Sequence, residues 1–173
     1  WAGDGAICES ANMPAIGIYY GETIRNAGQA SVAGDDWMAV ARRRYLEPAE
    51  AAEHLCHPAL ARHLIGALQQ DDFDISVMRA VPPGKFEGHA YSYVHRFCMA
   101  DGVVPIVPVF LNAYFLPNQP TPARCFALGE AMARAVAAFP ADLRVGIMAS
   151  GGLSHFVVDE AFDRALLDAL RRK

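Results

Sequence analysis

Residues 143–155 read Leu-Arg-Val-Gly-Ile-Met-Ala-Ser-Gly-Gly-Leu-Ser-His. The first half of this stretch, through Met148, alternates and is rich in apolar and β-branched residues, which predicts a buried strand. The pair Gly151-Gly152 then lets the backbone turn sharply. His155 therefore follows closely after the carboxyl end of the predicted strand, where the ligands and catalytic groups of open α/β sheets gather.

Strands and helices alternate through the rest of the chain. The predicted strands are 14–20, 73–77 and 103–112, and the predicted helices are 47–54, 57–70, 89–98, 121–138 and 159–173. We expect 103–112 to be a central strand buried on both faces, with at least one of Pro105 and Pro108 at a bulge, end or edge because proline cannot donate a ladder hydrogen bond. We expect 21–37 to be an irregular connection. The last two helices are expected to bury Phe126, Leu128, Met132 and Val136, and Phe162, Leu166, Leu167 and Leu170. The alternation predicts an α/β fold, a layered sandwich with a mixed, mainly parallel central sheet flanked by helices.

Length and composition limit the class of protein. A chain of 173 residues is predicted to form one domain, 1–173, and its 53% hydrophobic content excludes a disordered protein. No apolar run is long enough for a membrane span. A net charge of −4 provides no basic surface for nucleic acid. We therefore expect neither a membrane nor a nucleic-acid partner.

The cysteines and the two ends of the chain add two expectations. Cys8, Cys56, Cys98 and Cys125 form no C-x-x-C pair, which indicates buried free thiols in a reducing cytoplasm and hence a cytoplasmic protein. The chain opens at Trp1 as if at the end of a strand, and it stops at Lys173 within a helical pattern. We expect both ends to be truncated relative to a longer gene product.

Two of the six histidines are candidate site residues. His155 can take or give a proton near neutral pH, although a loop histidine hydrogen-bonded to backbone would have the same sequence context. His89 starts a predicted helix after Glu87-Gly88, where the helix dipole favours a neutral imidazole. Structural roles are expected for His54, His57, His63 and His95. The residues alone thus predict an α/β domain with a one- or two-histidine site.

Three stretches together resemble a known family. They are 57–65 with 72–76, 107–112 with Ala123-Arg-Cys-Phe-Ala-Leu-Gly-Glu130, and 146–155 with its Gly-Gly-Leu-Ser-His end. In this order they resemble the class III extradiol ring-cleavage dioxygenases, the superfamily of the catalytic β subunit of protocatechuate 4,5-dioxygenase. The resemblance covers nearly the whole chain.

The resemblance implies a non-haem Fe(II) enzyme that cleaves a catechol-type substrate, protocatechuate- or gallate-like, with O2. The iron would be bound by two histidines and one glutamate, which leaves positions open for substrate and oxygen. His155 would then be the acid–base residue that assists substrate deprotonation, and His89 would orient substrate or oxygen. A homo-oligomer, with or without a small second subunit, is the expected assembly.

The iron ligands themselves do not match. The first ligand histidine of the family would precede Trp1, the triplet Gly3-Asp4-Gly5 has glycine where the second would lie, and the glutamate would follow Lys173. The carboxylates of Asp4 and Glu9 lie near the matching loop. Two hypotheses follow. One is an extradiol dioxygenase, and the other is a metal-free, non-catalytic relative that acts as a binding or interaction module.

Overall fold

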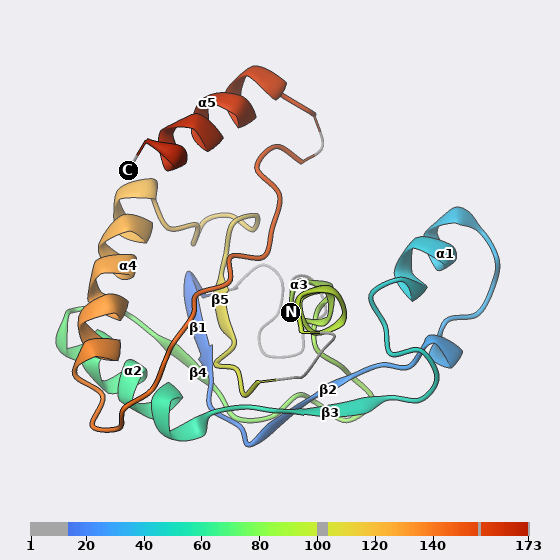
Figure 1. The fold of residues 1–173 in the computed structure, drawn as a ribbon, viewed down its shortest axis with the longest axis horizontal. Coiled ribbons are helices and arrows are strands. Elements are labelled where there is room, and N and C mark those ends of the chain that lie inside the picture. The colour runs from blue at the N-terminus through green and yellow to red at the C-terminus, as the bar shows by residue number, and fades with distance from the viewer. Residues whose placement is uncertain (1–13, 100–103, 156, 173) are drawn as a thin grey trace.

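The structure is a computed structural model and describes residues 14–99, 104–155 and 157–172. Its strands are β1 (Ile16–Tyr19), β2 (Thr23–Asn26), β3 (Ala52–Leu55), β4 (Ser76–Met78) and β5 (Val109–Leu111). Its helices are α1 (Trp37–Arg43), α2 (Pro58–Gln70), α3 (His89–Tyr93), α4 (Pro122–Ala137) and α5 (Glu160–Arg171), with a 3-10 turn η2 (Gln29–Ser31) and a π-helical turn η3 (Val94–Cys98). Figure 1 shows their arrangement.

The sheet is mixed, and β1 is its central strand. β1 pairs in parallel with β4, where Ile18 lies opposite Val77, and antiparallel with β5, where Ile18 lies opposite Val109. β2 and β3 form a separate antiparallel ribbon. The predicted layered α/β fold with a mixed sheet is confirmed. The assignment of 1–173 to one domain stays a prediction.

The main core lies between the sheet and the pair α2–α4, which lie together on one side of β1 (Figure 1). Ile16 and Ile18 of β1 point into this core, since side chains alternate across a strand. The buried residues that the two helices contribute are Leu60, Ala61, Leu64, Leu68, Leu128, Ala131 and Ala135. A second cluster is formed by Tyr19, Ile24, Cys56 and Met78. It joins the sheet to the ribbon that carries part of the site.

Both long helices of the core begin where the sequence predicts. His57 is the N-cap of α2 and accepts a hydrogen bond from the Leu60 amide through Nδ1, at 3.1 Å. Thr121 caps α4 by accepting from the Arg124 amide at 3.2 Å. α2 ends before Asp72, which has a φ of +61°. Capping chemistry is local in sequence, and for this reason these boundaries were predictable.

The predicted helix over 47–54 is wrong, and the predicted irregular connection over 21–37 is wrong in part. Residues 52–55 form β3, because β2 offers them an antiparallel partner. The expected connection contains β2 and η2, and at Trp37 it enters α1, which Asp36 caps. Pairing between segments distant in sequence overrides local helix propensity here.

The predicted central strand over 103–112 is also wrong. β5 has only three residues and lies at the edge of the sheet, as expected for a segment with two prolines. Pro108 is buried and its carbonyl accepts from the Tyr19 amide at 3.0 Å, but a proline has no amide to complete a ladder.

The predicted buried strand over 143–148 is not a strand. Residues 143–148 are extended and exposed, with Ile147 at 76% exposure, and none of the described residues pairs with them in a sheet. α5 forms as predicted but buries none of its residues. In α4, Leu128 is buried as expected and Phe126 is exposed. No helix in the described ranges is long and apolar enough to cross a membrane.

Candidate functional site

His155 lies on an exposed connection between α4 and α5. The neighbouring Ser154 is held by Asp163 of α5: its amide donates to one carboxylate oxygen at 3.0 Å and its hydroxyl to the other at 2.7 Å. The Ser154 hydroxyl also accepts from the Asp159 amide at 3.1 Å. These contacts fix the backbone next to His155 and leave the imidazole at the surface.

His89 is the first residue of α3, with Gly88 as the N-cap, as predicted from the sequence. Its side chain is exposed, and its ring lies 5.8 Å from the ring of Tyr45, measured between centroids. The Tyr91 hydroxyl donates to the Val109 carbonyl at 3.0 Å and so ties α3 to β5. His89 is thereby presented from a helix that is anchored to the sheet.

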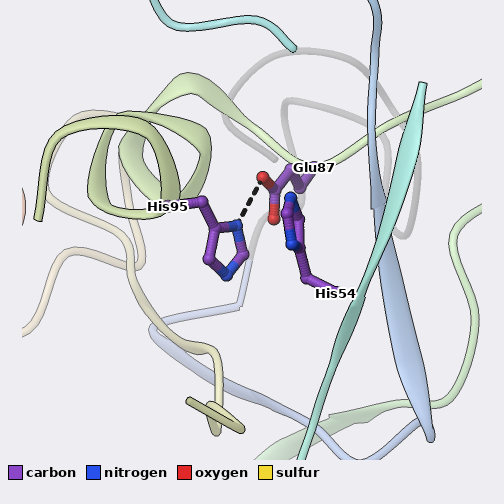
Figure 2. A group of neighbouring side chains, drawn as sticks. All are labelled: His54, Glu87 and His95. Carbon is purple, nitrogen blue, oxygen red and sulfur yellow. Dashed lines mark hydrogen bonds and ion pairs between the residues drawn. The ribbon is translucent and has the colours of Figure 1, made fainter. Parts of the chain in front are cut away.

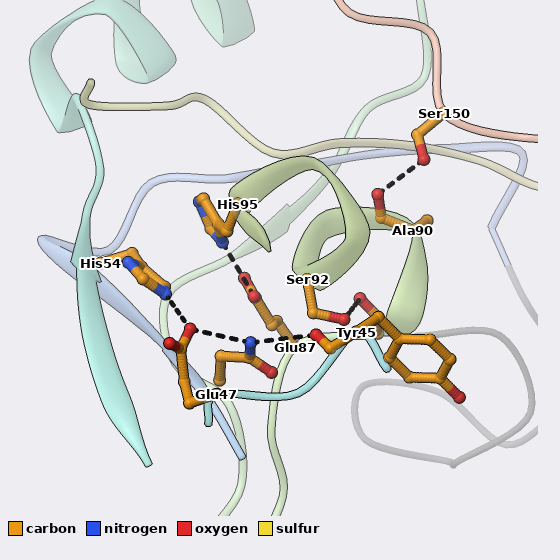
Figure 3. A network of polar contacts seen from close by, with 10 residues as sticks. Tyr45, Glu47, His54, Glu87, Ala90, Ser92, His95 and Ser150 are labelled. Carbon is orange, nitrogen blue, oxygen red and sulfur yellow. Dashed lines mark hydrogen bonds and ion pairs between the residues drawn. The ribbon is translucent and has the colours of Figure 1, made fainter. Parts of the chain in front are cut away.

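The structure brings the loop that contains Gly151-Gly152 to the start of α3. The Ser150 hydroxyl donates to the Ala90 carbonyl at 2.6 Å, as Figure 3 shows. Ser150 immediately precedes the glycine pair, and Ala90 immediately follows His89. The two predicted site segments are therefore in contact, although they lie far apart in the chain.

A buried cluster of His54, Glu87 and His95 was missed by the sequence analysis (Figure 2). One potential ligand atom from each residue lies within 4.8 Å of the others. His95 Nδ1 lies 2.8 Å from Glu87 Oε1, and these side chains are 1% and 0% exposed. The His54 and His95 rings are 4.0 Å apart between centroids. Structural roles had been expected for both histidines, and neither sequence spacing nor a local motif links the three residues.

Three separate segments position this cluster. His54 comes from the buried face of β3. Glu87 precedes α3, and its amide donates to the Arg25 carbonyl of β2 at 2.8 Å. His95 lies in the π-helical turn η3, a rare geometry that is frequent at functional sites. A single sequence carries no signal for a π-helical turn, which explains why the cluster was missed.

Glu47 and Asn26 extend the cluster on the side of His54 (Figure 3). Glu47 Oε1 lies 2.8 Å from His54 Nε2 and accepts from Asn26 Nδ2 at 3.0 Å. Burial acts to raise the pKa of Glu47, but the hydrogen bonds from His54 and Asn26 outweigh it and lower its pKa overall. Only glycine fits at Gly28 beside this segment, because a Cβ there would clash with the Ala49 carbonyl oxygen. The close approach of Gly28 to the backbone of residues 49–51 keeps Glu47 next to the β2–β3 ribbon.

The buried carboxylate of Glu87 affects neighbouring groups. Burial, followed by the charge of Glu87, raises the pKa of the Cys56 thiol to about 12. The same two causes raise the pKa of the Tyr91 hydroxyl. Cys56 is buried and free, as predicted for the cysteines, whereas Cys98 is free but exposed, which contradicts that prediction.

Several buried polar atoms of this region lack a partner among the described residues. They are Asn26 Oδ1, Glu87 Oε2, His95 Nε2 and Arg96 Nε. A buried polar atom without a hydrogen bond destabilises a fold unless another ligand satisfies it. The donor types of His54, Glu87 and His95, two imidazoles and a carboxylate, are those of a transition-metal site. The cluster can therefore hold a metal ion.

An open hollow of about 630 Å³ lies beside α1 and α3. Its lining residues are Ala41, Arg44, Tyr45, Tyr93 and Phe97. The rings of Tyr93 and Phe97 are 4.6 Å apart between centroids, and Tyr45 also contacts His89. The hollow thus combines aromatic surface with one guanidinium next to a predicted site residue.

Comparisons with known proteins place the chain in a family. A gallate dioxygenase of Pseudomonas putida is 39% identical over 106 residues, which is 60% of this chain and 30% of that protein. A 2,3-dihydroxyphenylpropionate/2,3-dihydroxicinnamic acid 1,2-dioxygenase of Comamonas testosteroni is 33% identical over 129 residues, 73% of this chain and 35% of that protein. The chain spans about a third of the length of these curated relatives. Because residues 46–172 match the model of the catalytic LigB subunit of aromatic ring-opening dioxygenase, the chain belongs to that family.

Proposed function

We propose that this chain takes part in the extradiol cleavage of a carboxylated catechol, protocatechuate- or gallate-like, with O2 and Fe(II). Membership of the LigB family and the dioxygenase names of both relatives support the reaction class. The observation that carries the proposal is the 2.6 Å contact from the Ser150 hydroxyl to the Ala90 carbonyl. It joins the segment of His155 to that of His89, the two residues that the resemblance assigns to proton transfer and substrate orientation.

The proposal assigns each histidine a task on the substrate. The His155 imidazole accepts a proton from a catechol hydroxyl, which makes the ring electron-rich, and returns it later in the reaction. The His89 imidazole orients the substrate by a hydrogen bond. The exposure of both residues supports these roles, since a side chain must be reachable to touch substrate.

The described residues do not fit the catalytic iron of the family. His54, Glu87 and His95 have suitable donor atoms, but Glu87 and His95 are fully buried and present no open coordination position to a catechol. The loop with Gly3-Asp4-Gly5, which matches the family's ligand loop, lies outside the described residues. When bound, Fe(II) would activate O2 and the chelated catechol; the proposal assigns its ligands to none of the described residues.

The hollow beside α3 supports a carboxylated substrate. A catechol ring can stack on the Tyr93 and Phe97 rings, and the Arg44 guanidinium can bind a ring carboxylate in a bidentate manner. Tyr45 links this hollow to His89. We extend the proposal to a cytoplasmic homo-oligomer, with or without a small second subunit, and the exposed apolar residues of 143–148 and α5 support association.

The test is reconstitution of the purified chain with Fe(II) without oxygen, followed by gallate or protocatechuate and air. Once the iron ligands, which no described residue supplies, are provided, ring-opened product with matching O2 uptake is expected, and His155→Ala should lower kcat by about 100-fold or more, the size of a general acid–base contribution. The matched control is His63→Asn, because the His63 ring contacts the Ala135 carbonyl within the core at 2.8 Å. Equal loss in both variants would contradict the role of His155.

The substrate carboxylate is tested through Arg44. Arg44→Ala should raise KM for protocatechuate by about 10-fold or more and leave KM for 4-methylcatechol unchanged, because only the first substrate has a carboxylate. An equal change for both substrates would contradict the proposed pairing.

A metal-free binding or interaction module is the second candidate function. The observation that favours it is Gly5, which occupies the position of a ligand histidine in the family. This candidate predicts that gallate binds the iron-free chain and that Fe(II) causes no turnover. Stoichiometric Fe(II) with ring-opened product would exclude it.

A further inference from the structure

We propose that His54, Glu87 and His95 bind one divalent transition-metal ion in a closed, structural site, distinct from the catalytic iron expected for the family. The site would join β3, the segment before α3 and the π-helical turn η3, which are separate in sequence. The ion is of the class that prefers imidazole nitrogen with carboxylate oxygen, and Zn²⁺ is the probe that represents it.

The hydrogen bonds of the two histidines are those of metal ligands. A ligand histidine usually gives one ring nitrogen to a carboxylate and the other to the metal, so that the carboxylate orients the ring. His54 Nε2 lies 2.8 Å from Glu47 Oε1, and His95 Nδ1 lies 2.8 Å from Glu87 Oε1. Each ring therefore has its second nitrogen left for an ion. For His95 this nitrogen, Nε2, is buried and has no partner among the described residues.

Glu87 supplies the third donor. Its Oε1 atom is engaged by His95, whereas Oε2 is buried and has no partner in the described part of the chain. In Figure 2 the Glu87 carboxylate lies beside the His54 and His95 rings, whose centroids are 4.0 Å apart. A metal ion bound to the cluster would give the buried Oε2 atom a partner, which no hydrogen bond within the described residues provides.

The spacing is close to that of a bound site. In a tetrahedral zinc site with bond lengths of about 2.1 Å, neighbouring ligand atoms lie about 3.4 Å apart. One potential ligand atom from each of the three residues lies within 4.8 Å of the other two. Binding therefore requires these atoms to approach one another by up to about 1.4 Å, through rotation of side chains such as those of His54 and Glu87.

The local charge suits a cation. Glu47 and Glu87 both place a carboxylate in the cluster, each 2.8 Å from a histidine nitrogen. Two carboxylates beside two imidazoles offer fixed negative charge to a divalent cation. Burial of an ion is most favourable where opposite charge is already fixed.

The test uses the tag-free chain, freed of metal by a chelator and titrated with Zn²⁺ in competition with a chromophoric chelator. One Zn²⁺ per chain is expected, with a melting temperature that rises by several degrees in excess Zn²⁺, because an ion that binds only the folded state stabilises it. Glu87→Gln and His95→Asn should each weaken binding by more than about 100-fold, and Glu47→Gln by about 10- to 100-fold.

Two controls separate this site from others. His63→Asn removes a histidine outside the cluster and should leave Zn²⁺ affinity unchanged. The double variant Asp4→Asn/Glu9→Gln removes the carboxylates near the family's ligand loop and should also leave it unchanged. Loss of binding in the double variant with retention in Glu87→Gln would overturn the proposal.

A measurement on the wild-type chain tests the proposal even where a variant does not fold. X-ray absorption of the Zn²⁺-loaded chain should show two imidazole ligands and no sulfur, since His54 and His95 are the nitrogen donors. A sulfur ligand, or no stoichiometric Zn²⁺, would overturn the proposal. Ring opening is measured separately with Fe(II), so that failure of this site and failure of the dioxygenase proposal are distinguishable.

Discussion

Helices α2 and α5 have the same kind of apolar spacing, but α2 is packed in the core and α5 is exposed. α2 lies against β1 and α4 and buries Leu60, Ala61, Leu64 and Leu68, whereas α5 lies apart from the sheet and buries nothing (Figure 1). Both helices formed where the sequence predicts. Amphipathic spacing therefore predicts a helix and the face that could be buried, but the residues that cover this face must come from elsewhere in the structure.

The polar contacts differ between the same two regions. The His95–Glu87 pair is almost completely buried, whereas the Arg164–Glu160 pair of α5 has both side chains about three-quarters exposed. Water and salt screen the exposed pair, but the buried carboxylate has only its protein partners. Substitutions in the interior should therefore change the free energy of unfolding strongly, and substitutions in α5 should change it weakly.

The largest effect is expected from Glu87→Ala. Removal of one partner of a buried pair leaves the other without compensation and should lower the free energy of unfolding by about 3–5 kcal/mol. Arg164→Ala, which removes the exposed pair of α5, should change it by less than about 1 kcal/mol. Urea denaturation of the metal-free chain measures both. Similar losses of unfolding free energy in the two variants would contradict the expected difference between the buried cluster and α5.

Truncation of apolar side chains should also have different costs in the two helices. Leu68 is 0% exposed and Leu170 is 60% exposed. Leu68→Ala creates a cavity and should cost about 2–5 kcal/mol of unfolding free energy. Leu170→Ala should cost less than about 0.5 kcal/mol, because its side chain is largely in water in both states. A large cost at Leu170 in dilute solution would mean that α5 packs against a partner, including a second copy of the chain.

The reactivity of Cys56 and Cys98 with a labelling reagent tests how well the interior is buried. Because burial and the charge of Glu87 raise the pKa of Cys56 to about 12, its reactive thiolate is scarce at pH 8 and becomes abundant only as the pH rises toward that value. Iodoacetamide at pH 8 should label exposed Cys98 at least about 100-fold faster than Cys56, as read by mass spectrometry of the peptides. Comparable labelling would show that the interior opens readily.

Among the variants expected to destabilise the core, the helix-cap variant should have the smallest effect. Thr121→Ala removes the hydrogen bond that begins α4 and should lower the free energy of global unfolding by about 1 kcal/mol. Asp159→Ala removes the matching bond to the Phe162 amide in α5. It should raise amide hydrogen exchange within α5 and leave the global midpoint unchanged. A shift of the midpoint by Asp159→Ala would show that α5 unfolds together with the core.

The site was only partly predictable. Local context in the sequence selects His89 and His155, and their roles stay a prediction; the Ser150–Ala90 contact joins the two segments that contain them. The cluster of His54, Glu87 and His95 was not predicted, because its residues come from a strand, a loop and a π-helical turn. A single histidine in a sequence carries no sign of which distant carboxylate will lie beside it.

By itself, the sequence determined the helices α2, α4 and α5, where they begin, and the family, because capping, apolar spacing and the Gly-Gly-Leu-Ser-His motif depend on neighbouring residues. Only the tertiary structure decided which extended segments became strands, since a strand exists only when another edge supplies its hydrogen bonds. For this reason 52–55 is a strand against local propensity, and 143–148 is not a strand despite its pattern. The same long-range pairing assembled the buried cluster.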